Sequence, residues 1–264
     1  MAAAADGGGA GAAVAEAAEE AHERVLERAK EDKRVGWPAE PPSVRERKHG
    51  WFLDTHKRVF GAILRAEPVR TVIELGSWYG ASTAWLASEV GRGARVYAVD
   101  LWDDAFILRD DHYNKSETLG GMLGDHPLYE TFLKNLWRHR ETVTPLRMST
   151  IEGLELLHAA GVDPEVIYID ADHHYEAVYA DVKRCLELFP DATLVGDDYG
   201  HYKDVENAVI QNAAAFGKTL HVDANHCWTY ATLRSDTGQT FTPGPEQRRR
   251  DEPAAAAAPP AGAA

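Results

Sequence analysis

Apolar and polar residues alternate along the middle of the chain in a way that predicts strands separated by helices. The run from Thr71 to Leu75 is short, apolar and rich in β-branched side chains, as is typical of a buried strand. A glycine turn follows, and Ala81–Val90 then places apolar residues on one helical face before Arg95–Val99 forms a second apolar run. Strand, crossover helix and strand within about thirty residues predict a βαβ unit, whose ligand binds at the carboxyl ends of the strands.

The same alternation continues and predicts three further parallel strands and a closing strand pair. The last two strands are separated only by a short turn, which indicates that they run antiparallel. We therefore expect an α/β fold: a doubly wound three-layer sandwich with a Rossmann-like sheet and right-handed crossovers. The strands are predicted at residues 142–148, 166–170, 192–196, 218–222 and 228–233, and the helices between them at residues 151–160, 175–188 and 205–216.

Segments of different composition flank this predicted domain, which covers residues 67–234. On its amino-terminal side we expect a disordered Ala/Gly tail over residues 1–13 and then helices and a linker over residues 14–66. The second of these helices, Trp51–Ala66, is strongly amphipathic and is expected to cover the sheet or the mouth of the site. The Pro/Ala/Gly-rich residues 240–264 are predicted to be disordered.

In two segments the pattern of apolar and polar residues does not determine a single structure. The helix predicted at residues 14–33 has only a thin apolar stripe, which fits either a loosely docked helix or one that binds a partner. Residues 104–126, which precede a helix predicted at residues 128–140, are polar, irregular in pattern and contain three glycines. Structureless segments of that length are usually lids or binding loops, so we expect this one to close over the site.

Composition narrows the choice of partners and compartment. The 264 residues carry a formal net charge of -14, and a field of that sign repels nucleic acid and anionic membranes. We expect neither as a partner, and a homodimer is left open. Cys185 and Cys227 are too few for a disulfide framework or a zinc site and fit buried thiols in a reducing compartment. Without an apolar run of membrane length or a targeting peptide, a cytoplasmic location is expected.

The turn after the first strand, residues 76–80, indicates which ligand the βαβ unit binds. A dinucleotide site needs a middle glycine so that the backbone can approach a pyrophosphate, but Trp78 occupies that position. A P-loop is also absent, because no Gly-Lys-Ser/Thr follows the turn. The ligand is therefore expected to be a nucleoside without phosphates. S-adenosylmethionine (SAM) fits, because its ribose hydroxyls suit Asp100 and its ammonium group suits the acidic and carbonyl groups near Glu74 and Gly76.

This pattern resembles that of the class I SAM-dependent methyltransferases, in which E-x-G-x-x-x-G follows the first strand and an acidic residue ends the second. The resemblance covers roughly residues 68–233. It implies that Trp102 lies beside the adenine, although this residue fits the core equally well, and that Ser149 reaches the adenine edge. The SAM site it implies consists of Glu74, Gly76, Ser77, Trp78, Gly80, Asp100, Trp102, Ser149 and Asp170.

Aspartates also stand at the ends of the fourth and fifth predicted strands. Asp170 ends the fourth strand, and Asp197 and Asp198 end the fifth. In a doubly wound sheet of this order the two strands are neighbours and the fourth lies beside the first, so the three carboxylates are expected to converge near the SAM methyl group. They repel one another unless they are protonated or bind a cation. Hard oxygen ligands without cysteine indicate Mg²⁺, or else Ca²⁺ or Mn²⁺, rather than zinc.

The aspartates resemble those of metal-dependent O-methyltransferases that act on catechol-type phenols or on sugar hydroxyls of natural products. The segments IDADHHYE and GDDY are most similar to the branch that includes macrocin-type and cephalosporin-pathway methyltransferases. His173 stands where the phenol-acting members often have lysine, so the resemblance does not imply a catechol acceptor.

The expected reaction is methyl transfer from SAM to a hydroxyl of a small molecule. A metal held by the aspartates, Asp170 among them, would lower the pKa of that hydroxyl, and His173, His174 or His201 would accept its proton. Three other functions stay open. These are metal-independent methyl transfer to nitrogen or a carboxylate, an NAD(P)-dependent oxidoreductase, which Trp78 disfavours, and a non-catalytic binding protein on the same scaffold. The sequence does not identify the methyl acceptor.

Overall fold

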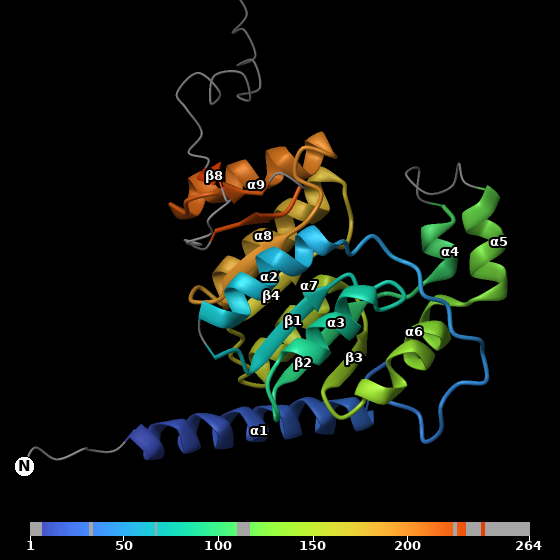
Figure 1. Ribbon diagram of the computed structural model, residues 1–264, viewed down its shortest axis with the longest axis horizontal. Coiled ribbons are helices and arrows are strands. Elements are labelled where there is room, and N and C mark those ends of the chain that lie inside the picture. The colour runs from blue at the N-terminus through green and yellow to red at the C-terminus, as the bar shows by residue number, and fades with distance from the viewer. Residues whose placement is uncertain are drawn as a thin grey trace, which may run out of the picture.

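A computed structural model describes residues 7–31, 34–66, 68–109, 117–223, 226–230 and 239–240. These residues form one eight-stranded sheet with helices on both faces (Figure 1). The order of the strands in the sheet is β3-β2-β1-β4-β5-β7-β6-β8. The strands are β1 (Thr71–Leu75), β2 (Arg95–Asp100), β3 (Val143–Arg147), β4 (Val166–Ile169), β5 (Thr193–Gly196), β6 (His221–Val222), β7 (Trp228–Thr229) and β8 (Gln239–Thr240).

Five parallel strands, from β3 at one edge to β5, form the larger part of the sheet, as the alternating pattern predicted. β1 pairs with β2 on one side and with β4 on the other, and β4 pairs with β5. The carboxyl ends of β1, β4 and β5 therefore lie next to one another. β7 runs antiparallel to both β5 and β6, which confirms the predicted closing pair. The pattern did not predict β8, which pairs with β6.

Two apolar clusters hold the helices on the sheet. One face packs against α7, α8 and α9, and the other against α2, α3 and α6. Successive strand residues enter opposite clusters: Val72 belongs to the α2 side and Ile73 to the α8 side. This confirms the three-layer sandwich. None of the helices in the described part of the chain combines the length and apolarity that a membrane span requires. The helices are α1 (Gly7–Glu31), α2 (Asp54–Ala66), α3 (Ala81–Glu89), α4 (Asp104–Ile107), α5 (Glu117–Asp125), α6 (Leu128–Leu136) with the short η1 (Trp137–His139), α7 (Thr150–Ala159), α8 (Tyr175–Leu188) and α9 (Lys203–Phe216).

The flanking segments depart from the predictions. α1 begins at Gly7, inside the segment predicted to be disordered. Residues 104–126 were predicted to be irregular but contain the two helices α4 and α5, so that prediction is wrong. A cap explains the first of them, because the Asp103 side chain accepts a hydrogen bond from the Phe106 N–H at 3.0 Å. The rest of the predicted tails, lid and last strand lies outside the described residues, at 1–6, 110–116, 231–238 and 241–264.

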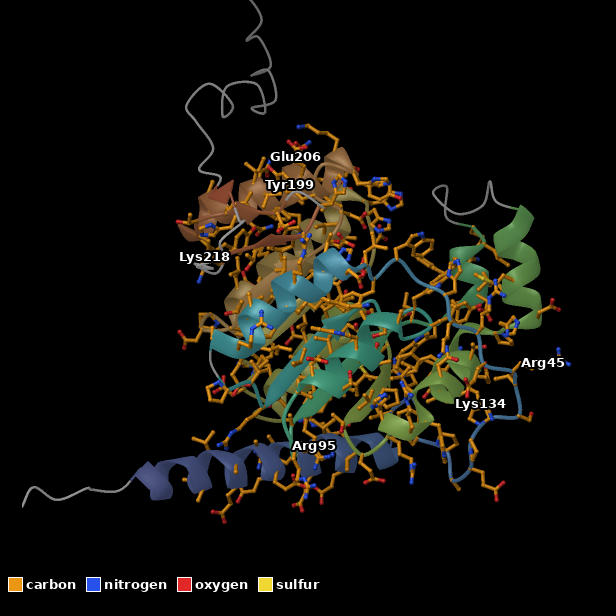
Figure 2. The ribbon with its side chains drawn as sticks, viewed as in Figure 1. Arg45, Arg95, Lys134, Tyr199, Glu206 and Lys218 are labelled. Atoms are coloured by element: carbon orange, nitrogen blue, oxygen red, sulfur yellow. The ribbon has the colours of Figure 1, made fainter. Side chains whose placement is uncertain are left out.

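α1 lies across the amino end of the sheet, away from the strand ends that carry the aspartates (Figure 1). His22 is buried, and its Nδ1 lies 3.1 Å from the hydroxyl oxygen of Tyr97. Arg95, which Figure 2 shows beside this helix, donates to both carboxylate oxygens of Glu19 at 3.0 and 2.9 Å. Val25 is fully buried. Of the two possibilities left open for this segment, the structure therefore shows a helix docked on the domain.

Candidate active site at the carboxyl ends of the strands

The turn after β1 places the backbone of Gly76 against the end of β4. Gly76 has a φ of 84°, a conformation that favours glycine, and its N–H donates to the Val99 carbonyl at 2.9 Å. A Cβ added to Gly76 would lie 2.0 Å from the carbonyl oxygen of Asp170, so no side chain fits there. The turn predicted to hold the methyl donor is thus in direct backbone contact with the strand end that carries the first aspartate.

Glu74 is fully buried beneath this turn. Its Oε2 accepts hydrogen bonds from the Ser77 hydroxyl at 2.6 Å and from the Thr83 hydroxyl, whereas its Oε1 has no hydrogen-bond partner within the described part of the chain. Burial raises the pKa of Glu74 to about 6, although the hydrogen bonds act in the opposite direction. A buried carboxylate with an unused oxygen beside the glycine turn fits the site of a cationic nucleoside such as SAM.

Asp100 organises the other side of the turn. Its Oδ2 accepts hydrogen bonds from the backbone N–H groups of Ser77 and Trp78 at 2.8 and 2.9 Å, and its Oδ1 accepts one from Trp102 at 2.7 Å. Burial raises the pKa of Asp100 even though these three bonds favour the charged form. Because each carboxylate oxygen can accept more than one hydrogen bond, the predicted contact with ribose hydroxyls is compatible with this arrangement.

Both tryptophans of the predicted SAM site have left-handed backbone conformations, with φ of 50° at Trp78 and 40° at Trp102. The Trp78 indole donates to Nδ1 of His49 at 3.2 Å. Trp102 is only 1% exposed, and its indole donates to the Trp78 carbonyl at 2.8 Å while its ring lies 4.4 Å from that of Phe132. Trp102 therefore supports the turn from the core, a placement that favours its core role over a contact with adenine.

Two further residues of the predicted SAM site, Gly80 and Ser149, stand at helix starts. Gly80 precedes α3 with a φ of 85° and leaves no room for a Cβ beside Leu136. Ser149 forms a capping box with Glu152 at the start of α7, in which the Ser149 hydroxyl accepts from the Glu152 N–H at 3.3 Å and the Glu152 carboxylate accepts from the Ser149 N–H at 3.1 Å. Helix formation alone accounts for both arrangements.

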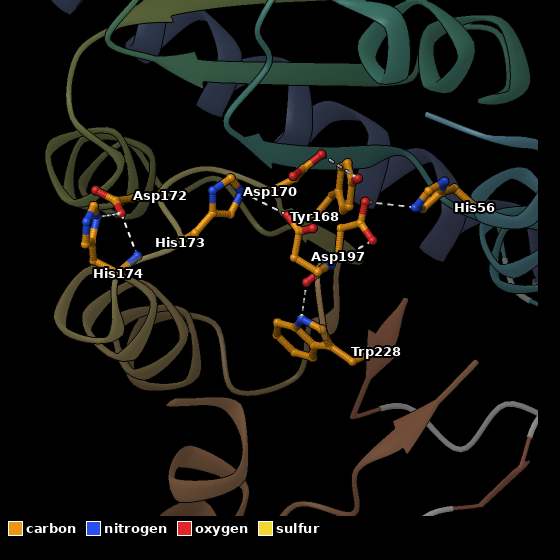
Figure 3. Close-up of polar contacts among 9 residues, drawn as sticks. His56, Tyr168, Asp170, Asp172, His173, His174, Asp197 and Trp228 are labelled. Atoms are coloured by element: carbon orange, nitrogen blue, oxygen red, sulfur yellow. Dashed lines mark hydrogen bonds and ion pairs between the residues drawn. The ribbon is translucent and has the colours of Figure 1, made fainter. Parts of the chain in front are cut away.

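Asp170, His173 and Asp198 come together where β4 and β5 end, and we call them the acid–histidine cluster. One ligand-type atom from each side chain lies within 4.8 Å of the other two. Nε2 of His173 is 2.9 Å from Oδ2 of Asp198, and the Tyr168 hydroxyl donates to Oδ2 of Asp170 at 2.8 Å. Figure 3 shows Asp170 between Tyr168 and His173. Burial, and then the charges of Asp197 and Asp198, raise the pKa of Asp170 to about 7.

The His173 ring is fixed by contacts with Tyr202 and Asp198. It stacks on the ring of Tyr202, with centroids 4.3 Å apart and planes inclined by only 9°. Burial alone would lower the pKa of His173, but the hydrogen bond to Asp198 and the charges of Asp198, Asp170 and Asp172 outweigh burial and raise it. The cluster therefore contains a fixed imidazole whose basicity is increased by its neighbours.

Asp197 points away from the acid–histidine cluster and toward α2 (Figure 3). Its Oδ2 lies 2.8 Å from Nε2 of His56, and its Oδ1 accepts a hydrogen bond from the Asp198 N–H at 2.7 Å. The structure thus brings together a different set from the three aspartates predicted as metal ligands, because His173 takes the place of Asp197. His56 was not predicted from the sequence as a residue of the site. The available signal was its spacing from Phe52, Val59 and Phe60, which places it on the buried face of α2.

The other two histidines considered as bases lie outside the cluster. Nδ1 of His174 is 2.7 Å from Oδ1 of Asp172, which also accepts from the His174 N–H, and the His174 side chain is 47% exposed. His201 is exposed, and its ring contacts those of Tyr202 and His226. Of the three candidates, the described structure brings only His173 to the aspartates.

A small pocket of about 10 Å³, room for roughly one water molecule or one ion, lies at the cluster. Two carboxylates and an imidazole are ligands that fit a divalent metal, and they suit Mn²⁺, Fe²⁺ or Zn²⁺ better than the expected Mg²⁺, which prefers oxygen ligands alone. Asp170, His173 and Asp198 are the residues that would hold it. The pocket is lined by Ile169, Asp170, Ala171, Asp172, His173, Val178, Asp197, Asp198, Val205 and Trp228.

Residues 73–199, which contain the glycine turn and all three predicted metal ligands, match a family model described as a methyltransferase domain. Solved structures with a similar fold include a protein from Klebsiella pneumoniae provisionally assigned as an O-methyltransferase (17% identity over 79% of this chain and 87% of that one, TM-score 0.47). They also include an O-methyltransferase from Bacillus cereus in complex with SAH (17%, 79% and 89%, TM-score 0.43). A third is an O-methyltransferase from Streptomyces achromogenes involved in tomaymycin synthesis, in complex with SAM (13%, 80% and 87%, TM-score 0.45). Likenesses of this size carry no conclusion about the substrate. No curated protein matches the chain.

Proposed function

We propose that this chain, whose residues 73–199 form a class I SAM-dependent methyltransferase domain, transfers the methyl group of SAM to a hydroxyl group of a small molecule. The proposed acceptor is small rather than a nucleic acid, because the formal net charge of -14 repels polyanions. The proposed reaction takes place at the acid–histidine cluster, at the carboxyl ends of β4 and β5.

The observation that carries this proposal is the contact between Gly76 and Asp170. A Cβ at Gly76 would meet the Asp170 carbonyl oxygen at 2.0 Å, so the donor turn and the strand end that begins the cluster are separated by no side chain. A methyl donor bound on the turn and an acceptor bound at the cluster would be neighbours, and holding two reactants at near-attack distance accounts for a large part of catalysis in such reactions.

Different residues of the site would bind the donor, orient the imidazole and act on the acceptor. SAM supplies an electrophilic methyl group when bound. Asp100 fixes the turn through the backbone N–H groups of Ser77 and Trp78, and Asp198 holds the His173 imidazole at 2.9 Å. His173, which alone among the candidate bases lies in the cluster, would be a ligand of a bound metal, and without a metal it is placed to take the proton of the acceptor hydroxyl. A divalent metal held by Asp170, His173 and Asp198 would lower the pKa of that hydroxyl.

A metal-independent reaction is the second candidate, and the contact between His173 and Asp198 favours it. The 2.9 Å distance from Nε2 to Oδ2 is that of a histidine oriented by a carboxylate, an arrangement that serves a general base without any metal. In this case His173 accepts the proton itself and Asp198 stabilises the imidazolium. Sensitivity to a chelator separates the two candidates.

The test is methyl transfer to a panel of small phenols, sugars, amines and carboxylic acids, followed as formation of S-adenosylhomocysteine. We expect hydroxylated compounds to be methylated, and activity to fall after EDTA treatment and to return with Mn²⁺. Asp198→Asn is expected to abolish the activity while SAM still binds in calorimetry. Asp181→Asn is the matched control, because Asp181 is a buried acid whose hydrogen bond goes to Thr150 outside the cluster. Methylation of amines or carboxylates alone would overturn the proposal, and full activity in EDTA would leave only the metal-independent form.

A further inference from the structure

The helix α2 lies outside residues 73–199, yet it places one polar side chain beside the candidate active site. His56 is only 3% exposed, and its Nε2 lies 2.8 Å from Oδ2 of Asp197. Asp197 is the residue before Asp198, a member of the acid–histidine cluster. Through this buried contact the amino-terminal segment reaches the end of β5.

The surroundings of His56 fix both its orientation and its tautomer. The backbone N–H of Leu53 donates to Nδ1 of His56 at 2.9 Å, so Nδ1 carries a lone pair. The proton of the neutral ring must then be on Nε2, which is the nitrogen that faces Asp197. The ring of Phe52 stacks on that of His56, with centroids 5.4 Å apart and planes inclined by 22°. His56 is thus a fixed imidazole whose Nε2 lies within 2.8 Å of one carboxylate oxygen.

The contact continues from Asp197 into the backbone of Asp198. Oδ1 of Asp197 accepts the Asp198 N–H at 2.7 Å, and the Asp197 carbonyl accepts the Trp228 indole N–H at 3.1 Å. Asp198 has a φ of 64°, a left-handed conformation that is unfavourable for an L-residue and that its surroundings must compensate. In this conformation its carboxylate meets His173 at 2.9 Å.

We propose that His56 is a positioning residue of the active site. It holds the Asp197 carboxylate turned away from the acid–histidine cluster, so that Asp197 keeps Asp198 in the left-handed conformation that brings it to His173. The helix α2 is thereby a working part of the site and not only a cover of the sheet. The catalytic consequence of this inference rests on the proposed function of the cluster in methyl transfer; the geometric part does not.

The test compares three variants of the full chain. His56→Phe keeps the ring that stacks on Phe52 but removes both nitrogens, whereas His56→Gln restores an N–H donor that can reach Asp197. His22→Phe is the matched control, because His22 is also a buried histidine on an amino-terminal helix, 6% exposed and 3.1 Å from a hydroxyl, but at the other end of the sheet. Thermal unfolding and SAM affinity verify that each variant is folded with an intact donor site.

Two readouts separate positioning from simple stabilisation. For His56→Phe we expect kcat to fall about 10- to 100-fold, as is usual when a side chain that orients an active-site group is lost, with KM for SAM within about twofold of the wild type. His56→Gln is expected to recover most of kcat, and His22→Phe to leave it unchanged. The second readout is hydrogen exchange of the Asp198 amide, measured by NMR, which we expect to accelerate in His56→Phe only.

The catalytic part and the positioning part of the inference can be overturned separately. Wild-type kcat in His56→Phe, or an equal loss in His22→Phe, overturns the catalytic part of the inference. Unchanged Asp198 amide exchange in His56→Phe overturns the positioning itself, whether or not an acceptor has been found. If the wild type methylates no hydroxyl while Asp198 exchange still responds to His56→Phe, the proposed function fails and the positioning stands.

Discussion

Each end of the sheet receives a buried histidine from an amino-terminal helix, and the two ends use it differently. At the amino end, His22 of α1 meets the neutral hydroxyl of Tyr97, and burial lowers the pKa of His22 to about 4. At the carboxyl end, His56 of α2 meets Asp197, next to Asp170 and Asp198. A buried histidine with a partner is therefore no sign of function by itself.

What distinguishes the carboxyl end is a group of carboxylates whose charges destabilise the folded state. Burial and mutual repulsion raise the pKa of Asp170 to about 7, which means that the folded state is less stable with this carboxylate charged. Three of the left-handed non-glycine residues, Trp78, Trp102 and Asp198, also lie at this end. Strain and repulsion gathered at one place are typical of functional sites, where stability is given up for chemistry. The amino end shows paired groups instead.

Asp170→Asn is expected to produce the largest effect, and in opposite directions for activity and stability. Loss of one carboxylate of the cluster is expected to reduce kcat by about 10²–10³-fold. In the wild type the folded state retains a proton between pH 3.8 and about 7 that the unfolded state has released, so stability falls as pH rises through that window. Because asparagine does not ionise, Asp170→Asn does not lose stability in this pH window and is expected to be about 1–3 kcal/mol more stable than the wild type at pH 8. Methyl-transfer assays and urea unfolding measure the two effects.

Asp181→Asn is the control for this prediction. Burial raises the pKa of Asp181 on α8 to about 7 as well, and its carboxylate accepts a hydrogen bond from the Thr150 hydroxyl of α7 at 2.5 Å, outside the cluster. We expect a similar gain of stability at pH 8 with unchanged kcat. If Asp170→Asn destabilises the protein, or if both variants lose activity equally, the contrast between a charged site and an ordinary buried acid fails.

Gly76→Ala and Gly93→Ala compare the two ends at the level of the backbone. The φ angles are nearly equal, 84° and 81°, but a Cβ at Gly76 meets backbone atoms of Asp170 and Ala171, whereas one at Gly93 meets no atom of the described residues within 4 Å. We expect Gly76→Ala to lower the free energy of unfolding by about 3 kcal/mol or more, because the clash adds to the conformational strain. Gly93→Ala is expected to cost only about 1 kcal/mol. Calorimetric SAM titration should show weakened binding in Gly76→Ala alone, and equal effects would contradict a close contact at the site.

Sequence periodicity was sufficient for the framework of the fold. The β1–α3–β2 unit and the helix Tyr175–Leu188 could be predicted from the spacing of apolar residues, which is two in a strand and three to four in a helix. These spacings depend only on local backbone geometry. The helix Glu117–Asp125 did not follow, because its sequence ETLGGMLGD contains glycines that disfavour a helix, while buried Leu123 joins the tertiary core. Tertiary packing decided that segment.

The candidate site could be predicted as far as its strand ends and no further. Asp170, Asp197 and Asp198 were readable as acids at neighbouring strand ends, but which of the adjacent pair enters the cluster depends on the left-handed φ of Asp198. The spacing of residues along the sequence does not predict that φ angle. The contact of Asp197 with His56 is a long-range pairing of side chains on separate elements, so periodicity could show only that His56 is buried.

His22→Phe tests the amino end through pH. The depressed pKa of His22 means that the unfolded state takes up a proton below about pH 6.5 that the folded state takes up only near pH 4. Stability from this group is therefore present above pH 6.5 and lost as the pH falls toward 4, by about 1–3 kcal/mol. Urea unfolding between pH 4 and 8 should show a flatter profile for His22→Phe than for the wild type. Parallel profiles would mean that His22 is protonated in the folded state and that this end too holds a buried charge.

Glu19→Gln is expected to have the smallest effect. Glu19 binds Arg95 with two contacts of 3.0 and 2.9 Å, yet its side chain remains 58% exposed, so water and salt screen the attraction. The hydrogen bond from Arg95 lowers the pKa of Glu19, so any stability from the pair is present above the ordinary pKa and fades as the pH falls below it. We expect a loss of about 0.5 kcal/mol or less at pH 7, abolished in 1 M NaCl. A loss as large as that of His22→Phe would mean that surface charge rather than the buried face of α1 holds this helix. The amino end would then also depend on charge, and charge alone would no longer distinguish the two ends.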